Sequence, residues 1–419
     1  MAVITDEHIG LNPLPRTEFV ERFLEYITPL QDQEWMPLRQ ANGRILSQDM
    51  SSLYNLPSGR QAGGDSVVMR YAAFAEGMPS DEQTAQWVRG VDWERADMGD
   101  DFPDIFDCST HIEGVELLDN GGIRLIDDPP VIRGPETITQ PGSKMKVGDP
   151  LLPAGTVLTP LTIAYLASAG RTMVPVRRKV RVAFIPTGSE LTCAGQVLKR
   201  GQTPDSNSFM MEQLILQAGA VPVMFPIISD SREALAHALE QARAAADLVL
   251  INGGSSKGGE DFNAALLSER ATFYQHGVRL RPARVAAASV IDGIPHVNLP
   301  GPTMAARVVW EWLVRYALAK LAGAPSPQRV RVTAVLAEDA GPKGPGPKQK
   351  GPEGKGMPAQ MASEEFMSFF RVAWEDGRYV AYDAGMGHGA GAVMQCNALC
   401  IQQRMGRLQA GTQIEVELL

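Results

Sequence analysis

The chain has 419 residues, of which 44% are hydrophobic and 21% charged, and its formal net charge is −9. This length predicts about three domains, and the composition is that of a soluble globular protein. No apolar run approaches the ~20 residues that a membrane-spanning helix needs. The negative charge argues against nonspecific binding of nucleic acid. The first residues, MAVITDEHIG, carry acids rather than the basic region of an export signal, so we expect a cytoplasmic protein.

The N-terminal third predicts a helix followed by a small β-rich module. In PRTEFVERFLEYITPL (15–30), apolar residues recur at helical spacing after Thr17, a candidate N-cap. GRILSQDMSS (43–52) is typical of a strand, and strand-like alternation with Gly-rich turns continues to about residue 140. A Pro/Gly turn then leads into a helix that we expect to begin near Thr159 and to end at Gly170.

From residue 179 onwards, apolar strands and periodic helices alternate. KVRVAFIPTGSEL (179–191), VPVMFPIIS (221–229) and DLVLING (247–253) have the apolar runs of buried strands, and the segments between them have helical periodicity. This alternation predicts a parallel α/β sheet with crossover helices, closed by a helix near 305–321. In such sheets, ligands bind outside the carboxyl ends of the strands.

The last hundred residues have a different composition. GPKGPGPKQKGPEGKG (341–356) is too rich in Gly, Pro and Lys to join a core, so we predict a flexible loop there. The rest has short alternating strands separated by Gly turns, which is typical of a small β-barrel or sandwich. We expect the four cysteines to be buried thiols, because their spacing fits neither a zinc site nor a redox motif. They are Cys108, Cys193, Cys396 and Cys400.

Four polar clusters lie at predicted strand ends or helix starts of the α/β region. They contribute Thr187, Gly188 and Glu190; Asp205 and Ser208; Asp230; and, in the loop GGSSKGGED, Gly253, Gly254, Ser256, Gly258 and Asp261. Glycine-rich turns expose backbone N–H groups that bind oxyanions, and carboxylates beside a phosphate favour Mg²⁺ between them. Asp205 and Asp230 are equally consistent with helix N-caps, and serines among glycines are common in plain turns.

Two further segments complete the polar set. RLRPARV (279–285) supplies Arg281 and Arg284, which suit either an anion site or a solvated surface, and Pro300 and Gly301 form a turn before the last helix of this region. The glycine-rich loop lacks the Gly-Lys-Ser/Thr of a Walker A motif, and Gly-x-Ser-x-Gly is absent. The six histidines lack metal-ligand spacing, so zinc is not expected.

In combination, these segments resemble the MoeA-type molybdopterin molybdenumtransferases, a family that includes the C-terminal domain of gephyrin. The resemblance spans almost the full length and rests on GRILSQDM, LLPAGTVLTPLTIAYLASAG, RKVRVAFIPTGSEL through GQTPDSNS, GGSSKGGEDF and LQAGTQIEVELL. It implies an elongated four-domain subunit. Domain I would span 1–46 plus 141–177, the small β-rich domain II 47–140, a three-layer α/β molybdopterin-binding domain III 178–324, and a β-barrel-like domain IV 325–419.

The resemblance also implies an activity and roles for individual residues. The activity is magnesium-dependent insertion of molybdate into adenylylated molybdopterin with release of AMP, in a homodimer that receives substrate from a MogA-like adenylyltransferase and serves molybdoenzyme acceptors. The implied catalytic residues are Asp65, Glu190, Asp230 and Asp261, and the implied Mg²⁺ ligands are Asp149, Glu190, Asp230 and Asp261. The implied cofactor-binding residues are Thr187, Gly188, Asp205, Ser208, Gly253, Gly254, Ser256, Gly258, Arg281, Arg284, Pro300 and Gly301.

The chain departs from the family pattern in domain II and near the basic segment. RQAGGDSVV keeps only Asp65 of a motif that normally reads Asp-Asn-Ser-Ala-Met-Asp-Gly-Tyr-Ala, and Met98 stands where the next motif has threonine. LPGPT replaces Leu-Pro-Gly-Asn-Pro. Because Met and Pro cannot supply the lost hydroxyl and amide, these changes affect molybdate capture most. The alternative hypotheses are therefore a protein that binds or delivers the cofactor without turnover, or a scaffold.

Overall fold

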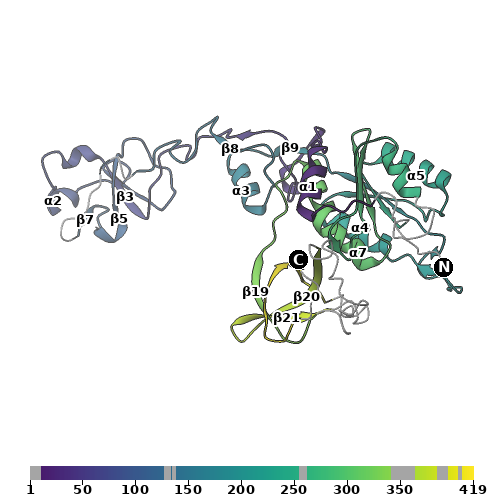
Figure 1. Ribbon diagram of the computed structural model, residues 1–419. Coiled ribbons are helices and arrows are strands. Elements are labelled where there is room, and N and C mark those ends of the chain that lie inside the picture. Colours follow the sequence, from purple (N-terminus) through teal and green to yellow (C-terminus); the bar gives the residue numbers. More distant parts are fainter. Residues whose placement is uncertain are drawn as a thin grey trace, which may run out of the picture. The chain divides into compact units, whose positions relative to one another are not determined.

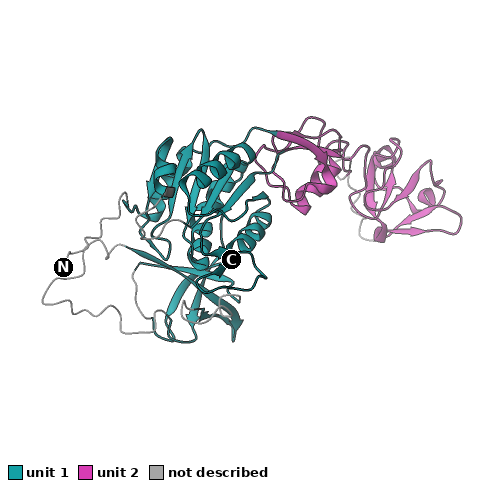
Figure 2. Cartoon of the chain, turned by 90° about the vertical axis from the view of Figure 1, so that its right-hand side faces the viewer, with its two compact units in different colours: residues 1–32, 177–419 teal, residues 33–176 magenta. Residues whose placement is uncertain are grey.

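The computed structural model of the chain describes residues 11–126, 134, 138–253, 262–340, 364–384, 395–403 and 408–419 (Figure 1). The chain divides into two compact units, which Figure 2 shows in different colours. Unit 1 comprises residues 1–32 and 177–419, and unit 2 comprises residues 33–176, so unit 2 is an insertion between two parts of unit 1. Within the described ranges, none of the helices has the length and apolar character to span a bilayer.

The centre of unit 1 is a six-stranded sheet with the strand order β13-β10-β14-β18-β17-β15. The strands are β10 (Arg181–Pro186), β13 (Val221–Met224), β14 (Leu248–Asn252), β15 (Ala271–His276), β17 (Ala287–Ile291) and β18 (Ile294–Leu299). The first four in spatial order are parallel, which confirms the predicted α/β sheet. Only β17 runs in the opposite direction, antiparallel to both of its neighbours, β18 and β15. Asp292 and Gly293, with φ of 52° and 78°, form the tight hairpin between β17 and β18.

Helices cover both faces of this sheet (Figure 1). One face packs against α1 (Arg16–Glu25), α4 (Asn207–Gln217) and a long helix made of α7 (Thr303–Val309), a π-helical turn η5 (Trp310–Val314) and α8 (Arg315–Ala322). The other face packs against α5 (Arg232–Ala245) and α6 (Phe262–Ser268). Along β10, Val182 and Phe184 face the first layer, and Ala183 and Ile185 face the second. This alternation gives the predicted three-layer arrangement.

Two details of unit 1 differ from the sequence predictions. Thr17 is not the N-cap of α1, because the helix begins at Arg16, directly after Pro15. Pro15 has an extended ψ of 143°, and its carbonyl oxygen accepts the hydrogen bond of the first turn, from the N–H of Phe19. Buried thiols are confirmed for Cys108 and Cys400, but the prediction is wrong for Cys193. Cys193 follows the short strand β11 (Leu191–Thr192), which pairs with β12 (Thr203–Pro204), and is exposed.

The C-terminal part of unit 1 is a closed five-stranded barrel, as predicted. Its strands are β19 (Arg331–Leu336), β20 (Glu365–Glu375), β21 (Arg378–Asp383), β22 (Ala398–Gln402) and β23 (Gln413–Leu418). The order is β20-β21-β19-β23-β22, and β22 closes the ring on β20. The two-residue strand β16 (Leu280–Arg281) also pairs with β20, so backbone hydrogen bonds attach the barrel to the α/β part. The predicted loop at 341–356 lies outside the described residues.

Unit 2 consists of short strands and small helices. Its pairs are β1 (Gln33–Pro37) with β9 (Met173–Arg177), β2 (Met50–Ser51) with β8 (Pro150–Leu152), and β6 (Val115–Leu117) with β7 (Ile123–Leu125). A three-stranded sheet contains β3 (Ser66–Met69), β4 (Trp93–Ala96) and β5 (Cys108–His111), and α2 spans Asp81–Thr84. The strand predicted over 43–52 is therefore reduced to β2 and isolated bridges at Ile45 and Leu46.

The helix α3 (Pro160–Ser168) follows the predicted limits. The side chain of Thr159 accepts a hydrogen bond from the N–H of Thr162, and Gly170 leaves the helix with φ of 86°. One small core joins residues on both sides of 47–140, for example Leu46 and Leu158, and two others lie within that range. The four-domain division remains a prediction, because the contacts of the chain separate it into two units only.

Candidate functional site

The carboxyl edge of the parallel strands gathers several predicted site residues. Thr187 and Gly188 follow β10, Gly253 follows β14, and Pro300 and Gly301 follow β18. Their backbones are joined directly. The N–H of Thr187 donates to the Asn252 carbonyl oxygen at 2.8 Å, and the N–H of Gly253 donates to the Leu299 carbonyl oxygen at 3.1 Å. Three turns that are far apart in the sequence thus form one edge, where ligands of such sheets bind.

The side chains of two buried asparagines connect the turns after β14 and β18. Asn252 is 3% exposed, and its Nδ2 donates to the Pro300 carbonyl oxygen at 2.8 Å. Its Oδ1 accepts from Nδ2 of Asn207 at 2.7 Å, and the same Asn207 nitrogen donates to the Gly301 carbonyl oxygen at 2.7 Å. Sequence reasoning missed both residues. For Asn252, the sequence contained a signal: it is a polar residue directly after the buried run Leu248 to Ile251, and such a side chain must find hydrogen-bond partners.

Close backbone approach or a positive φ explains two of the predicted glycines. Gly253 has φ of 113°, and a Cβ there would lie 2.4 Å from the Thr187 carbonyl oxygen. Gly188 has φ of 146°, and a Cβ there would lie 2.7 Å from a carboxylate oxygen of Glu190. The backbone contact at Gly253 therefore excludes any larger side chain, whereas at Gly188 the Glu190 side chain can move and the positive φ is what favours glycine. Gly301 is different, since its missing side chain would meet open space.

The two aspartates with alternative N-cap interpretations behave differently. Asp205 accepts hydrogen bonds from the N–H of Ser208 at 3.0 Å and from its Oγ at 2.5 Å, so it does cap the first turn of α4. Asp230 does not cap α5, because Ser231 does. Instead, Asp230 accepts from the N–H of Ser189 at 2.9 Å, and Ser189 Oγ accepts from the N–H of Asp230 at 3.2 Å. Asp230 therefore joins the turn that carries Gly188 and Glu190.

The structure shows whether the predicted acidic residues come together as Mg²⁺ ligands. Asp65 accepts from the N–H of Met98 at 3.0 Å and Asp149 from the N–H of Lys146 at 2.8 Å, both within unit 2. No three His, Cys, Asp or Glu side chains converge into a metal site in the ranges that the structure describes. In proteins, Mg²⁺ usually takes one or two carboxylates together with substrate phosphates. Glu190 and Asp230 are two such carboxylates, since Asp230 is hydrogen-bonded to Ser189, the residue directly before Glu190.

The two predicted anion-binding arginines face a buried carboxylate. Nε of Arg281 lies 2.7 Å from one Glu364 oxygen, and Nε of Arg284 lies 3.6 Å from the other. The Glu364 side chain is 6% exposed and precedes β20 of the barrel. The pair therefore keeps an excess of one positive charge. Gly254, Ser256, Gly258 and Asp261 lie outside the described residues.

Comparisons with known proteins agree with this geometry. A model described as "Probable molybdopterin binding domain" matches residues 183–320, and one described as "MoeA N-terminal region (domain I and II)" matches residues 14–170. The chain is 29% identical over 309 residues to the molybdopterin molybdenumtransferase of Nostoc sp., covering 70% of each sequence. It is 26% identical over 310 residues to that of Haemophilus influenzae, covering 72% of this chain and 76% of the relative.

The fold has a solved counterpart. A structure titled as the molybdopterin biosynthesis moea protein from Pyrococcus horikosii superimposes with a TM-score of 0.74 at 22% identity, over 97% of this chain and 99% of that one. The α/β sheet and its edge lie in the segment that matches the probable molybdopterin binding domain. Together the two models match residues 14–170 and 183–320, and the chain belongs to the MoeA family, which the sequence resemblance indicated. This membership assigns it to molybdenum cofactor biosynthesis, among transferases.

Proposed function

We propose that this chain inserts molybdate into adenylylated molybdopterin with Mg²⁺ and releases AMP. The observation that supports this most is the edge at which the side chains of Asn207 and Asn252 hold the turns after β14 and β18, and the Asn252 carbonyl oxygen accepts from Thr187 in the turn after β10. Glycine-rich turns held rigidly can present backbone N–H groups to an oxyanion, and they lie within the segment that matches a molybdopterin-binding domain. Preorganised donors of this kind stabilise developing charge without reorganising during the reaction.

The proposal gives the charged residues distinct roles. Glu190, Asp230 and Asp261 would hold Mg²⁺, and the ion would neutralise phosphate charge. Arg281 and Arg284 receive molybdate, for which their excess positive charge over Glu364 is suited. Asp65 and Asp149 are proposed as further catalytic and metal-binding carboxylates.

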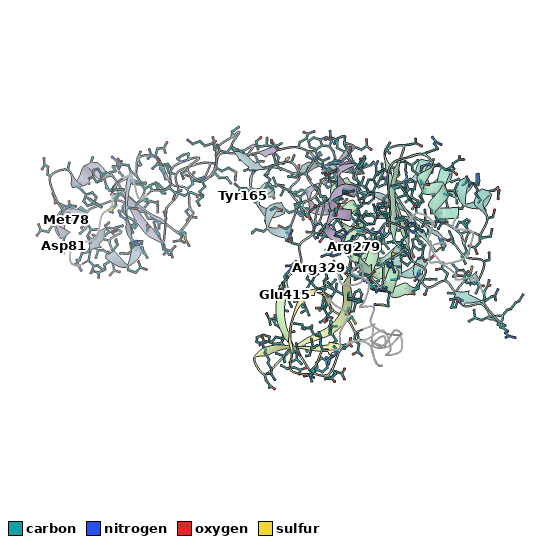
Figure 3. The ribbon with its side chains drawn as sticks, in the orientation of Figure 1. Met78, Asp81, Tyr165, Arg279, Arg329 and Glu415 are labelled. Carbon is teal, nitrogen blue, oxygen red and sulfur yellow. The ribbon has the colours of Figure 1, made fainter. Side chains whose placement is uncertain are left out.

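The proposal also includes a homodimer in the cytoplasm that receives substrate from a MogA-like adenylyltransferase and serves molybdoenzymes. Its support is the number of large apolar side chains exposed on unit 2, among them Trp35 on β1 and Leu161 on α3. Tyr165 on α3, which Figure 3 labels, is another. Exposed apolar surface of this kind marks association sites. Light scattering of the purified chain tests the dimer. A monomer at micromolar concentration that still turns over would remove it from the proposal.

The test of the activity is a titration of the purified chain with adenylylated molybdopterin and Mg²⁺, followed by molybdate, with AMP measured. We expect binding and then one AMP per bound substrate. Asn252→Leu removes two bonds of the edge and should weaken binding at least about tenfold, since each unsatisfied buried partner costs about 1–3 kcal/mol. Asn55→Ala is the control, because Asn55 accepts one exposed bond from the N–H of Val147 in unit 2. Absence of pterin binding would refute the proposal and leave the scaffold hypothesis.

A second candidate function is binding or delivery of the cofactor without turnover. The observation that favours it is the pairing of both candidate molybdate-binding arginines with Glu364, together with Met98, which is 73% exposed where the family pattern has threonine. Substrate binding without AMP release would support this candidate. Glu364→Gln then separates the causes. Restored release would show that the carboxylate blocks molybdate, whereas continued inactivity would show that the missing groups of unit 2 are required.

A further inference from the structure

A buried carboxylate lies in the long helix that begins after Gly301. Glu311 is on the π-helical turn η5, and its side chain is 1% exposed. Arg307 and Arg315 lie one turn before and one turn after it on the same helix. Arg329 comes from the segment between α8 and the barrel strand β19 (Figure 3). Three arginines from two segments of unit 1 thus surround one glutamate.

The distances show that all three guanidinium groups are at this carboxylate. Arg307 Nη2 lies 2.7 Å from Oε1 of Glu311, and Arg315 Nη1 lies 3.1 Å from Oε2. Arg329 Nη2 lies 2.5 Å from the same Oε2, and its Nη1 donates to the Leu418 carbonyl oxygen at 3.0 Å. The arginine side chains are only 13–20% exposed. Three positive charges therefore face one negative charge in a largely desolvated cluster.

The cluster also has unused donors. Nη1 of Arg307 and Nε of Arg329 are buried and have no hydrogen-bond partner among the described residues, and neither does Oε1 of Glu311, so the cluster leaves two donors and one acceptor unpaired. Glu311 is the only carboxylate within 4.0 Å of Arg307 and Arg329 in the described part of the chain. Burial lowers the pKa of Arg307, and Arg329 and Arg315 lower it further against the opposing effect of Glu311. Buried charged donors without acceptors are costly, so such groups commonly contact a water or an ion.

We propose that this arginine cluster binds a small oxyanion with two negative charges, such as inorganic phosphate or molybdate. A dianion balances the excess of two positive charges, which a single carboxylate or chloride would leave half uncompensated. Several acceptor oxygens can satisfy the free N–H groups of two guanidiniums at once, as arginine–phosphate pairs do. The site shares no residue with the edge formed by Thr187, Gly253 and Gly301, so it goes beyond the proposed function and does not depend on it.

The experiment is calorimetric titration of the full-length chain with inorganic phosphate, at constant ionic strength maintained with sodium chloride. We expect saturable binding of one phosphate per chain. Arg307→Gln should weaken it at least about tenfold, because a hydrogen bond to a charged group contributes about 1.5–3 kcal/mol. The matched control is Arg331→Gln. Arg331 is 66% exposed and pairs with Glu415 and Glu417 on the barrel surface, so its loss changes the net charge equally without touching the cluster.

A second variant gives a result of opposite sign. Glu311→Gln removes the competing carboxylate, so phosphate should bind more tightly than to the wild type and should raise the melting temperature of this variant more. If the cluster is only a structural ion network, Glu311→Gln lowers the melting temperature and phosphate does not restore it. Equal weakening by Arg307→Gln and Arg331→Gln, or no phosphate binding to any form, would overturn the proposal.

Molybdate titrated into the phosphate-loaded chain identifies the source of the ligand. The Arg281→Gln background removes the candidate molybdate site of the proposed function, so molybdate displacing phosphate in that background supports a second molybdate site at the cluster. Phosphate that stays bound supports a phosphate site. Because these readouts need no pterin, loss of the proposed transferase activity and loss of this anion site are measured separately.

Discussion

The two units of this chain differ most in charge. Residues 33–176, which form unit 2, contain 20 acidic and 11 basic residues, a formal charge of −9. Unit 1 contains 28 of each and is formally neutral. The net negative charge of the whole chain therefore comes entirely from unit 2. Local arginine clusters lie in the formally neutral unit 1, so the total charge says little about where anions bind.

The units also differ in packing. Unit 1 has one large core that includes Phe19, Phe184 and Trp312 and two smaller ones, whereas all three cores of unit 2 are small. A larger core buries more apolar surface per residue, so unit 1 should be the more stable. The candidate ligand edge therefore lies in unit 1, the unit with the larger core. The sequence departures from the family in 47–140 lie in the unit with the smaller cores.

The largest expected effect is the loss of unfolding free energy when one buried aromatic ring is removed from either unit. Trp312→Ala removes a buried ring that contacts Phe19 edge-to-face, and Phe106→Ala removes a fully buried ring of unit 2. Each should cost about 3–5 kcal/mol of unfolding free energy. Calorimetry should show two transitions, of which Trp312→Ala lowers only the higher and Phe106→Ala only the lower. A single transition that both variants lower equally would show that the units unfold together.

An effect of intermediate size is the pH dependence of the stability of unit 1. Burial, and to a smaller extent the positive charge of Arg243, lowers the pKa of His296 from 6.5 to about 4, against the smaller opposing effects of the Ile294 carbonyl and Asp292. Because the unfolded chain binds this proton below pH 6.5 and the folded chain does not, stability is lost as the pH falls from 6.5 towards 4. The loss should be about 2 kcal/mol at pH 5.

Urea titrations at pH 7.5 and pH 5 measure this loss. His296→Leu should reduce the difference between the two pH values, and the exposed His237→Gln should leave it unchanged. An unaltered difference in His296→Leu would show that other groups cause the pH dependence. The transition of unit 2 should be insensitive to either substitution.

The smallest expected effect is one of reactivity. Cys193 of unit 1 is exposed, whereas burial raises the pKa of Cys108 in unit 2 to about 12 and that of Cys396 and Cys400 in the barrel to about 11. A thiol reagent at pH 8 should therefore modify one cysteine per native chain, because the thiolate is the reactive form. Cys193→Ser should abolish the fast reaction with no change in stability. Rapid labelling of Cys108 would indicate that unit 2 opens far more readily than its packing implies.

Local patterns were sufficient for most elements of the fold. The alternation of apolar strands and periodic helices predicted the sheet, and the hydroxyl of Thr159 and the φ of Gly170 limit α3 as expected. These features depend on neighbours within a few residues, so one sequence contains them. Prediction was poorer in unit 2, where the strand expected over 43–52 is only two residues long, because short strands are decided by their partners.

The sequence by itself determined the family, the α/β and β-barrel architecture, and the turns that carry Gly188 and Gly253. Only the tertiary structure decided which polar groups meet. It pairs Asn207 with Asn252, places Glu364 between Arg281 and Arg284, and brings Arg329 to Glu311. The physical reason is that periodicity and turn chemistry act within one element. The partner of a buried polar group is instead chosen by the packing of segments distant in the chain, where every such group must find its hydrogen bonds or an ion.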